Sequence, residues 1–176
     1  MNLRVVERED VPLCAEWIND PEINGEHEPL LQASKTELEK WYGTLGPKEN
    51  LFFIEKKDGI KMGIIRHAAH GWGTVIGATI IPSERGKGYC TEAVKIMVDY
   101  LFLSKDVVRI QARTNQQNMA SQKVLEKAGF KKEGTMRKSN FSRGKWVDML
   151  VYSILKEEWK EPKILTKTVS QSQQHY

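Results

Sequence analysis

The chain has 176 residues, 28% of them charged, and its 27 lysines and arginines exceed its 23 aspartates and glutamates to give a net charge of +4. This length suits one domain with its own core, and the mild, mixed charge fits a small polyanionic ligand while giving little support for a nucleic-acid partner. No apolar run reaches membrane-spanning length and residues 1–4 do not open a signal peptide, so we expect a cytoplasmic protein without a membrane partner. Cys14 and Cys90 fit neither a disulfide framework nor a metal site, and we expect no bound metal.

Local patterns in the first 67 residues predict two helices between strands. Asp10, followed by Pro12, is typical of a helix start, and Ser34 with Glu37 three residues later forms a capping box. The segment between the two helices, residues 22–29, is acidic and is expected to be irregular. The predicted elements are a strand over 3–8, helices over 10–18 and 34–42, and a hairpin of strands 50–57 and 60–67.

The most informative stretch is a strand, a glycine-rich turn and a helix between residues 74 and 103. A β-branched run over residues 74–81 stops at Pro82, and the turn Arg85-Gly86-Lys87-Gly88 follows. Apolar residues then recur at the spacing of one helix face, at Cys90, Ala93, Val94, Met97 and Leu101. Such a turn directs several free N–H groups and the positive end of the helix dipole at one point. The sequence therefore predicts an anion site, most naturally for a phosphate or pyrophosphate.

Two common phosphate-binding motifs do not fit this turn. A P-loop needs Gly-x-x-x-x-Gly-Lys followed by Ser or Thr, whereas Gly86-Lys87 is followed by Gly88 and Ile81 stands five residues before Gly86. A dinucleotide fingerprint needs a third glycine where Thr91 stands, so Gly86-x-Gly88 matches it only in part. Two interpretations stay open: a site for a phosphate-bearing ligand, and a solvated loop that only caps a helix.

The second half of the chain completes a single α/β domain. Gly77, inside the 74–81 strand, indicates a bulge or a close backbone approach. Further predicted elements are strands over 107–113, 130–137 and 146–155, a helix over 118–128 and a helical turn over 157–159. The order β-α-α-β-β-β-α-β-α-β-β predicts a mixed sheet flanked by helices. We expect the domain to span residues 1–160, and residues 161–176, Ser/Gln-rich from Thr168, to form a poorly ordered tail.

Three features of the chain resemble the GNAT N-acetyltransferase superfamily. The turn Arg85-Gly86-Lys87-Gly88-Tyr89-Cys90 resembles its acyl-CoA-binding turn, Arg/Gln-x-x-Gly-x-Gly/Ala, with a Cys where the family usually has Gly or Ala. The order of elements is the one that this fold has. The stretch Asn118-x-x-Ser121-x-x-Val124-Leu125-Glu126-Lys127-x-Gly129-Phe130-x-x-Glu133-Gly134 and the ending Asp148-x-x-x-Tyr152-x-x-x-x-x-Glu158-Trp159 resemble the branch that acetylates ribosomal-protein N-termini (RimJ/RimL type). The resemblance runs from Leu3 to about Trp159 and implies a mixed, mostly antiparallel sheet with a splayed or bulged fourth strand.

The resemblance also implies the cofactor, acetyl-CoA. It implies that the main chain of Ile80 and Ile81 pairs with the pantetheine arm and that one amide near Ile80 polarises the acetyl carbonyl. Asparagines in the positions of Asn115 and Asn118 contact the CoA arm in related enzymes, although Asn118 is also well placed to be a helix N-cap. The residues expected to bind the cofactor are Ile80, Ile81, Arg85, Gly86, Lys87, Gly88, Tyr89, Cys90, Asn115, Asn118 and Ser121.

The catalytic acid is predicted to be a serine. Many family members carry a tyrosine general acid where this chain has Leu125, whereas in the ribosomal-protein branch a serine matching Ser121 has been given that role. We therefore predict Ser121 and the Ile80 amide as catalytic groups. A serine is a weak acid, so it acts by hydrogen-bonding the leaving thiolate or by relaying a proton through water.

The general base is harder to assign. One related enzyme type uses a glutamate at the position of Asn140, and an amide cannot take a proton. Replacement candidates are Glu26, His27 and Glu28, in a loop that borders the acceptor groove in this fold. Together they form an acidic rim that would bind a cationic amine, and the alternative is a solvated turn.

Three functions follow from these observations. The first is acetyl-CoA-dependent N-acetylation of a primary amine in a ternary complex, with a protein N-terminus ahead of a polyamine or aminoglycoside as the acceptor. The second is a nucleotide-binding regulatory module, which the partial Gly86-x-Gly88 match allows. The third is a catalytically inactive family member that senses CoA or scaffolds a complex, suggested by Leu125 and Asn140. Relatives are often dimers, so a homodimer is an open expectation.

Overall fold

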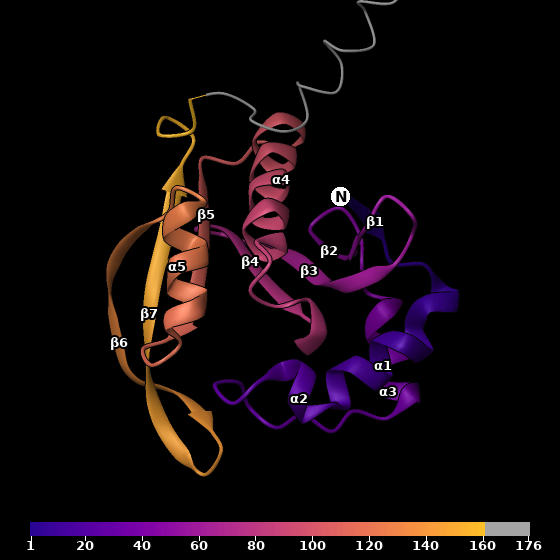
Figure 1. Cartoon of the computed structure of the whole chain (residues 1–176). Helices are drawn as coiled ribbons and strands as arrows, with labels where there is room; N and C mark the ends of the chain where they lie inside the picture. Colours follow the sequence, from indigo (N-terminus) through magenta and orange to yellow (C-terminus); the bar gives the residue numbers. More distant parts are fainter. Residues whose placement is uncertain (161–176) are drawn as a thin grey trace, which may run out of the picture.

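A seven-stranded sheet is the centre of the computed structural model, which describes residues 1–160 (Figure 1). The strands are β1 Asn2–Val5, β2 Glu49–Glu55, β3 Lys61–His70, β4 Gly73–Ile80, β5 Arg109–Asn115, β6 Lys131–Ser142 and β7 Lys145–Leu155. Their order in the sheet is β1-β2-β3-β4-β5-β7-β6, and every neighbouring pair is antiparallel except β4 and β5. The predicted class, a mixed and mostly antiparallel sheet flanked by helices, is confirmed.

The helices are α1 Val11–Asn19, α2 Pro21–Asn24, α3 Lys35–Tyr42, α4 Tyr89–Ser104 and α5 Met119–Lys127, with 3-10 turns η1 Arg8–Asp10 and η2 Pro82–Glu84. The order of elements is the predicted one, with α2 added. This short helix begins at Pro21 and runs into the segment that was expected to be irregular. Asp20 caps it by accepting hydrogen bonds from the N–H groups of Glu22 (2.7 Å) and Ile23 (3.4 Å). The expected tail over residues 161–176 lies outside the described residues.

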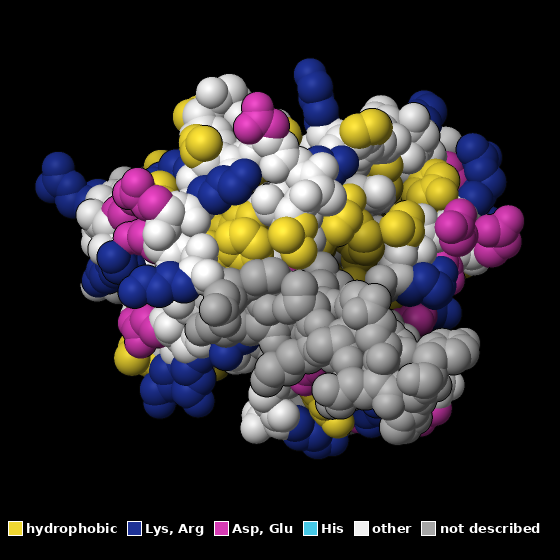
Figure 2. Space-filling model, turned by 90° about the horizontal axis from the view of Figure 1, so that it is seen from above, with side chains coloured by type: hydrophobic (Ala, Val, Ile, Leu, Met, Phe, Trp, Pro, Cys, Tyr) yellow, Lys and Arg dark blue, Asp and Glu magenta, His cyan; other side chains and the backbone are white. Residues whose placement is uncertain are grey.

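Alternation along β2 builds two cores on opposite faces of the sheet. Phe52 and Ile54 face the cluster that contains the buried residues of α4 and α5, and Leu51 and Phe53 face the cluster of α1. The predicted apolar face of α4 is buried at Ala93, Val94, Met97 and Leu101. Between Met1 and Lys160 no helix is long and apolar enough to cross a bilayer. The surface seen from above carries charges of both signs, interspersed, as the composition leads one to expect (Figure 2).

The main irregularity of the sheet lies between its two parallel strands. β4 and β5 pair only at Thr74 with Ile110 and Val75 with Gln111, and from there the strands run apart (Figure 1). On its other side β4 pairs with β3 without any register shift, so the bulge that was considered for Gly77 is absent. The fourth strand is therefore splayed from its parallel neighbour while it stays regular against its antiparallel one.

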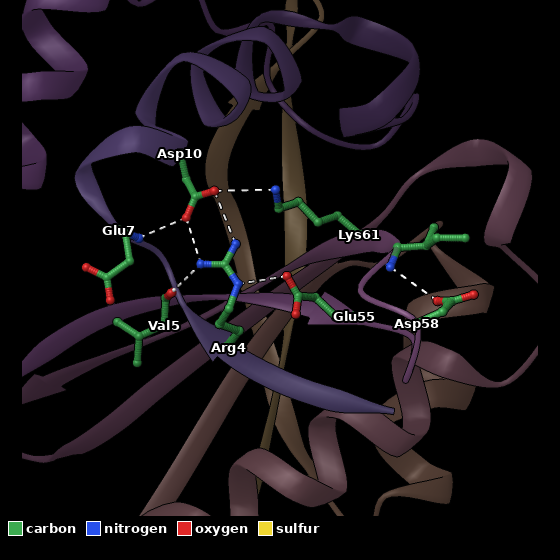
Figure 3. Close-up of polar contacts among 8 residues, drawn as sticks. Arg4, Val5, Glu7, Asp10, Glu55, Asp58 and Lys61 are labelled. Atoms are coloured by element: carbon green, nitrogen blue, oxygen red, sulfur yellow. Dashed lines mark hydrogen bonds and ion pairs between the residues drawn. The ribbon is translucent and has the colours of Figure 1, made fainter.

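Arg4 holds the first strand, the first helix and the β2–β3 hairpin together (Figure 3). Its Nε donates to Glu55 Oε1 at 2.8 Å and its Nη1 donates to Asp10 Oδ2 at 2.8 Å, while Lys61 Nζ lies 3.4 Å from Asp10 Oδ1. Asp10 stands at the predicted start of α1, but its carboxylate binds Arg4 and the Glu7 N–H and does not cap the N–H groups of the helix. The Arg4 hydrogen bond holds the pKa of Asp10 at about 2.

We expect Asp10→Asn to destabilise the protein at neutral pH and to lose this effect in acid. The pKa of Asp10 is lowered on folding, so its contribution is present above roughly pH 4 and disappears as the pH falls toward about 2. At pH 7 the free energy of unfolding should fall by about 1 kcal/mol. The decrease is small because solvent reaches Arg4, whose side chain is 38% exposed. Urea unfolding across this pH range measures it. Glu9→Gln, at an exposed neighbour, is the control, and equal curves for both variants would contradict the prediction.

Candidate functional site

The glycine-rich turn presents a set of free backbone donors. Gly86 (φ 75°) and Gly88 (φ 86°) both adopt left-handed conformations, and a Cβ on either would meet no atom within 4 Å. The first helical bond of α4 runs from the Glu92 N–H to Gly88 O at 3.1 Å. Within the described part of the chain, the N–H groups from Gly86 to Thr91 have no protein acceptor. The turn thus has the geometry that the sequence predicted for an anion site.

Lys56, which the sequence did not indicate, adds positive charge beside the turn. Lys87 Nζ lies 3.1 Å from Glu84 Oε2, and Lys56 Nζ, from the end of β2, lies 2.9 Å from Glu84 Oε1. Hydrogen bonds from the two lysines lower the pKa of Glu84, and the bond from Lys56 has the larger effect. Lys56 also lies 5.8 Å from the centre of the Tyr89 ring. Two lysines and one carboxylate leave a net positive charge beside the free N–H groups.

The Arg85 side chain connects two elements. Its Nε donates to Ile80 O at 3.0 Å, and its Nη2 donates to Glu22 O at 2.8 Å and to Ile23 O at 2.7 Å. The sequence predicted that this guanidinium would add charge to the anion site. The structure directs it at three carbonyls, so that it links α2 to the end of β4.

The two isoleucines at the end of β4 have different backbone environments. The Ile81 N–H donates to Met62 O at 2.9 Å and is therefore used in pairing with β3. Because successive N–H groups of a strand point in opposite directions, the Ile80 N–H points toward the side of β5, from which β4 has already separated. Of the two predicted main-chain contacts, the Ile80 amide is the one directed into the opening.

At the other side of the opening, two asparagines hold the backbone in place. Asn118 Oδ1 accepts the N–H of Ser121 at 3.0 Å, so the N-cap role that was considered for it is present. Asn115, 3% exposed at the end of β5, accepts the Gln117 N–H at 2.9 Å and donates to His27 O at 3.4 Å. The second bond joins the end of β5 to the loop after α2.

Ser121 lies in the first turn of α5, on the α4 face of the sheet. Its hydroxyl is partly exposed and makes no hydrogen bond to residues 1–160. Leu125, one turn later, is 5% exposed and belongs to the core. The place where a tyrosine acid stands in many related enzymes is therefore filled by core packing.

The three candidates for the base differ in environment. Glu26 is largely exposed and its Oε1 lies 3.5 Å from His27 Nε2. Glu28 also reaches solvent, yet desolvation raises the pKa of its carboxyl, while Arg66 acts in the opposite direction. A carboxyl whose pKa is raised in this way is suited to accept a proton nearer neutral pH than a fully solvated one.

An open groove lies between α2, η2 and the β6–β7 turn. Arg143, in that turn, donates from Nη2 to Gly25 O at 3.0 Å, so the hairpin tip reaches the loop after α2. The groove is lined by Pro21, Glu22, Gly25, Glu26, Pro82, Arg85 and Arg143. Of the three residues of the predicted acidic rim, Glu26 lines this groove, and the two arginines of the groove donate to backbone carbonyls. Nowhere in residues 1–160 do three His, Cys, Asp or Glu side chains gather as metal ligands do.

Comparisons with known proteins point in one direction. Residues 1–131 match the family model described as Acetyltransferase (GNAT) domain. A Bacillus subtilis protein named "Probable N-acetyltransferase YjcK" is 45% identical over 80 residues, 46% of this chain and 44% of that protein. YdaF of Bacillus subtilis, named as a candidate ribosomal N-acetyltransferase, is 33% identical over 88 residues, 50% of this chain and 48% of that protein. The matched segment spans about half the length of these curated relatives.

Among solved structures, the spermidine N-acetyltransferase from Vibrio cholerae in complex with CoA and spermine superposes with a TM-score of 0.82. The two sequences are 22% identical, and the superposition covers 90% of this chain and 96% of the other, which shows a shared fold. The family match takes in the glycine-rich turn, both separating strands and the helix that carries Ser121. The chain therefore belongs to the GNAT acetyltransferase family.

Proposed function

We propose that this protein is an N-acetyltransferase that moves an acetyl group from acetyl-CoA to a primary amine by direct attack in a ternary complex, with a protein N-terminal amine as the acceptor. The observation that carries the proposal is the separation of β4 from β5 beside a turn whose N–H groups have no protein acceptor. In this proposal residues 1–160 form the catalytic unit, in the cytoplasm.

The free donors fit the parts of acetyl-CoA. The N–H groups from Gly86 to Thr91 would hold the diphosphate, with Lys56 and Lys87 adding charge, and the open edge of β4 would pair with the pantetheine arm. The thioester supplies an activated acetyl group. The Ile80 N–H is directed into the opening and would hold the acetyl oxygen, and the loss of one such donor typically costs about 2.7–4 kcal/mol.

Proton transfer in this proposal uses both faces of the sheet. Glu28 lies in the loop that Asn115 holds at the end of β5, on the face away from α4, whereas Ser121 lies on α5 at the α4 face. The amine would lose its proton to Glu28 on one side, and the leaving thiolate would be hydrogen-bonded by Ser121 on the other. This division removes the need for the glutamate that Asn140 replaces.

The acceptor has two candidates. A protein N-terminus is supported by the motif between Asn118 and Gly134 and by the likeness to YdaF. A polyamine is the alternative, supported by the fold shared with a spermidine N-acetyltransferase. An acidic rim would serve either cation.

Titration of the purified protein with acetyl-CoA should show binding, and NAD should show none. Thiol release with a panel of peptides and polyamines should then show turnover. Gly88→Ala should weaken acetyl-CoA binding at least tenfold, because its Cβ would project into the space that the ligand occupies. Gly59→Ala is a matched control: Gly59 has φ 84° and also has no atom within 4 Å, so both variants carry the same backbone strain. If both variants bind acetyl-CoA equally well, the turn is not part of the acetyl-CoA site. Binding of NAD without binding of acetyl-CoA would support a nucleotide-binding module.

Glu28→Gln should lower kcat at least 100-fold, which is the lower part of the range for general bases. Burial raises the pKa of Glu28, and only the deprotonated form accepts a proton, so wild-type activity should fall as the pH drops through this raised pKa. The variant should lose this acid limb. Glu26→Gln, at the exposed neighbour, should keep it. A pH profile of kcat that is the same for wild type and Glu28→Gln would exclude Glu28 as the base.

Ser121→Ala should lower kcat roughly tenfold, less than a strong acid would, because a hydroxyl is a weak proton donor. The effect should be largest with poor acceptors at high pH, and acetyl-CoA binding should change little. Ser139→Ala, in the exposed part of β6, is the control. If turnover and its pH profile are unchanged in Ser121→Ala, Ser121 does not stabilise the leaving thiolate, and water alone must do so.

A further inference from the structure

Two arginines and a glycine share the face of the sheet away from α4. Arg66 of β3 pairs with Gly77 of β4, so their side-chain positions share a face. On β5, the pairing of Val75 with Gln111 places Arg113, two residues later, on this same face. The opposite face is the one toward α4, because His67 lies against Tyr100. Arg66, Gly77 and Arg113 therefore lie on one face of three strands, in a row that widens between Gly77 and Arg113 because β4 and β5 have separated there.

The row is open in its middle. Gly77 is exposed, and a Cβ built on it would lie 3.7 Å from Arg66 Nε, so the Arg66 guanidinium lies beside the glycine. The Arg113 guanidinium lies 5.8 Å from the centre of the Trp72 ring, which stacks on His70 at 5.2 Å. Within residues 1–160, neither arginine has an acidic partner within 4 Å. Any larger side chain at position 77 would fill the space beside the Arg66 guanidinium.

This row adjoins the place where the amine has to bind. Asn115 lies on the same face as Arg113, two residues further along β5, and holds the loop that carries Glu28. Two residues of a strand span roughly 6.6 Å, a distance that an arginine side chain can reach across. The charge of Arg66 acts on Glu28. An amine bound at Glu28 would thus have two cations on the side of the sheet, while the exposed Glu26 lies in the loop itself.

The chemistry of this surface distinguishes among amines. A polyamine brings further positive charges, which the two arginines would repel. A carboxylate near the amine would be complementary, since guanidinium groups bind carboxylates with paired, charge-assisted hydrogen bonds. The shape agrees, because Gly77 leaves room for such a group beside the Arg66 side chain.

We propose that the acceptor of this protein is a primary amine with a carboxylate close to it, held by Arg66 and Arg113 over Gly77. The inference rests on the proposed acetyl transfer and narrows its acceptor. The carboxylate has two sources: an acidic side chain in the first residues of a protein N-terminus, or the carboxylates of a free amino acid.

The test compares acceptors that differ in one charge. Peptides that begin Ser-Glu, Ser-Gln and Ser-Lys, free glutamate and spermidine are assayed by thiol release with wild type, Arg66→Gln, Arg113→Gln and the exposed control Arg8→Gln. For wild type and the control, kcat/KM should be at least tenfold higher for Ser-Glu than for Ser-Gln, and lowest for Ser-Lys and spermidine. Each row variant should lose most of this preference through the KM of the acidic acceptor, with the KM of acetyl-CoA unchanged. The double variant Arg66→Glu/Arg113→Glu should reverse the preference toward Ser-Lys.

The outcomes separate the two proposals. A preference for spermidine, or equal use of the three peptides by all variants, overturns the inference and leaves acetyl transfer intact. Turnover of glutamate above that of the peptides supports a free amino acid as the source of the carboxylate. If no amine releases thiol, the proposed function fails; titration of the Ser-Glu and Ser-Gln peptides into the CoA-loaded protein then decides whether the row binds a carboxylate.

Discussion

The fold depends on the separation of two parallel strands that pair for only two residues. A strand that loses its neighbour keeps N–H and C=O groups without partners, and a buried group of this kind costs about 1–3 kcal/mol. β4 tolerates this because its other edge is fully paired with β3 and because the opening gives the free groups access to solvent or ligand. The same logic holds for the turn after β4, where N–H groups are also left free. Both sets of donors lie along one path, and that path is the candidate binding site.

The loop after α2 is held at this path by contacts from three distant elements. Arg85 binds two carbonyls of α2, Arg143 reaches the Gly25 carbonyl from the β6–β7 turn, and Asn115 donates to His27 O from the end of β5. All three are side chains that bind backbone oxygens, so they specify the position of the loop without specifying its side chains. The bond from Asn115 to His27 O fixes the backbone next to Glu28, the base in the proposed function.

Much of the fold could be predicted from the sequence, because its signals are local. The capping box at Ser34, the glycines at 86 and 88 and the apolar face of α4 each depend on residues within a few positions of one another. The features that sequence patterns missed depend on pairing between segments far apart. Lys56 meets Glu84 across 28 positions, and the carboxylate of Asp10 leaves its helix for Arg4. Gly77 was singled out for a bulge or a close backbone approach; its exposure beside Arg66 follows from strand register, which no local pattern contains.

The shared core beneath the separating strands has a consequence for binding. The cluster around α4 and α5 joins residues of β2 and β3, such as Phe52 and Ile65, to residues of β5 and β7, such as Ile110 and Leu150. Because one packed interior supports both halves of the sheet, they cannot swing together or apart without breaking it. The opening is therefore preorganised: a ligand enters a slot that exists before it arrives, and its affinity is not reduced by the work of opening a closed form.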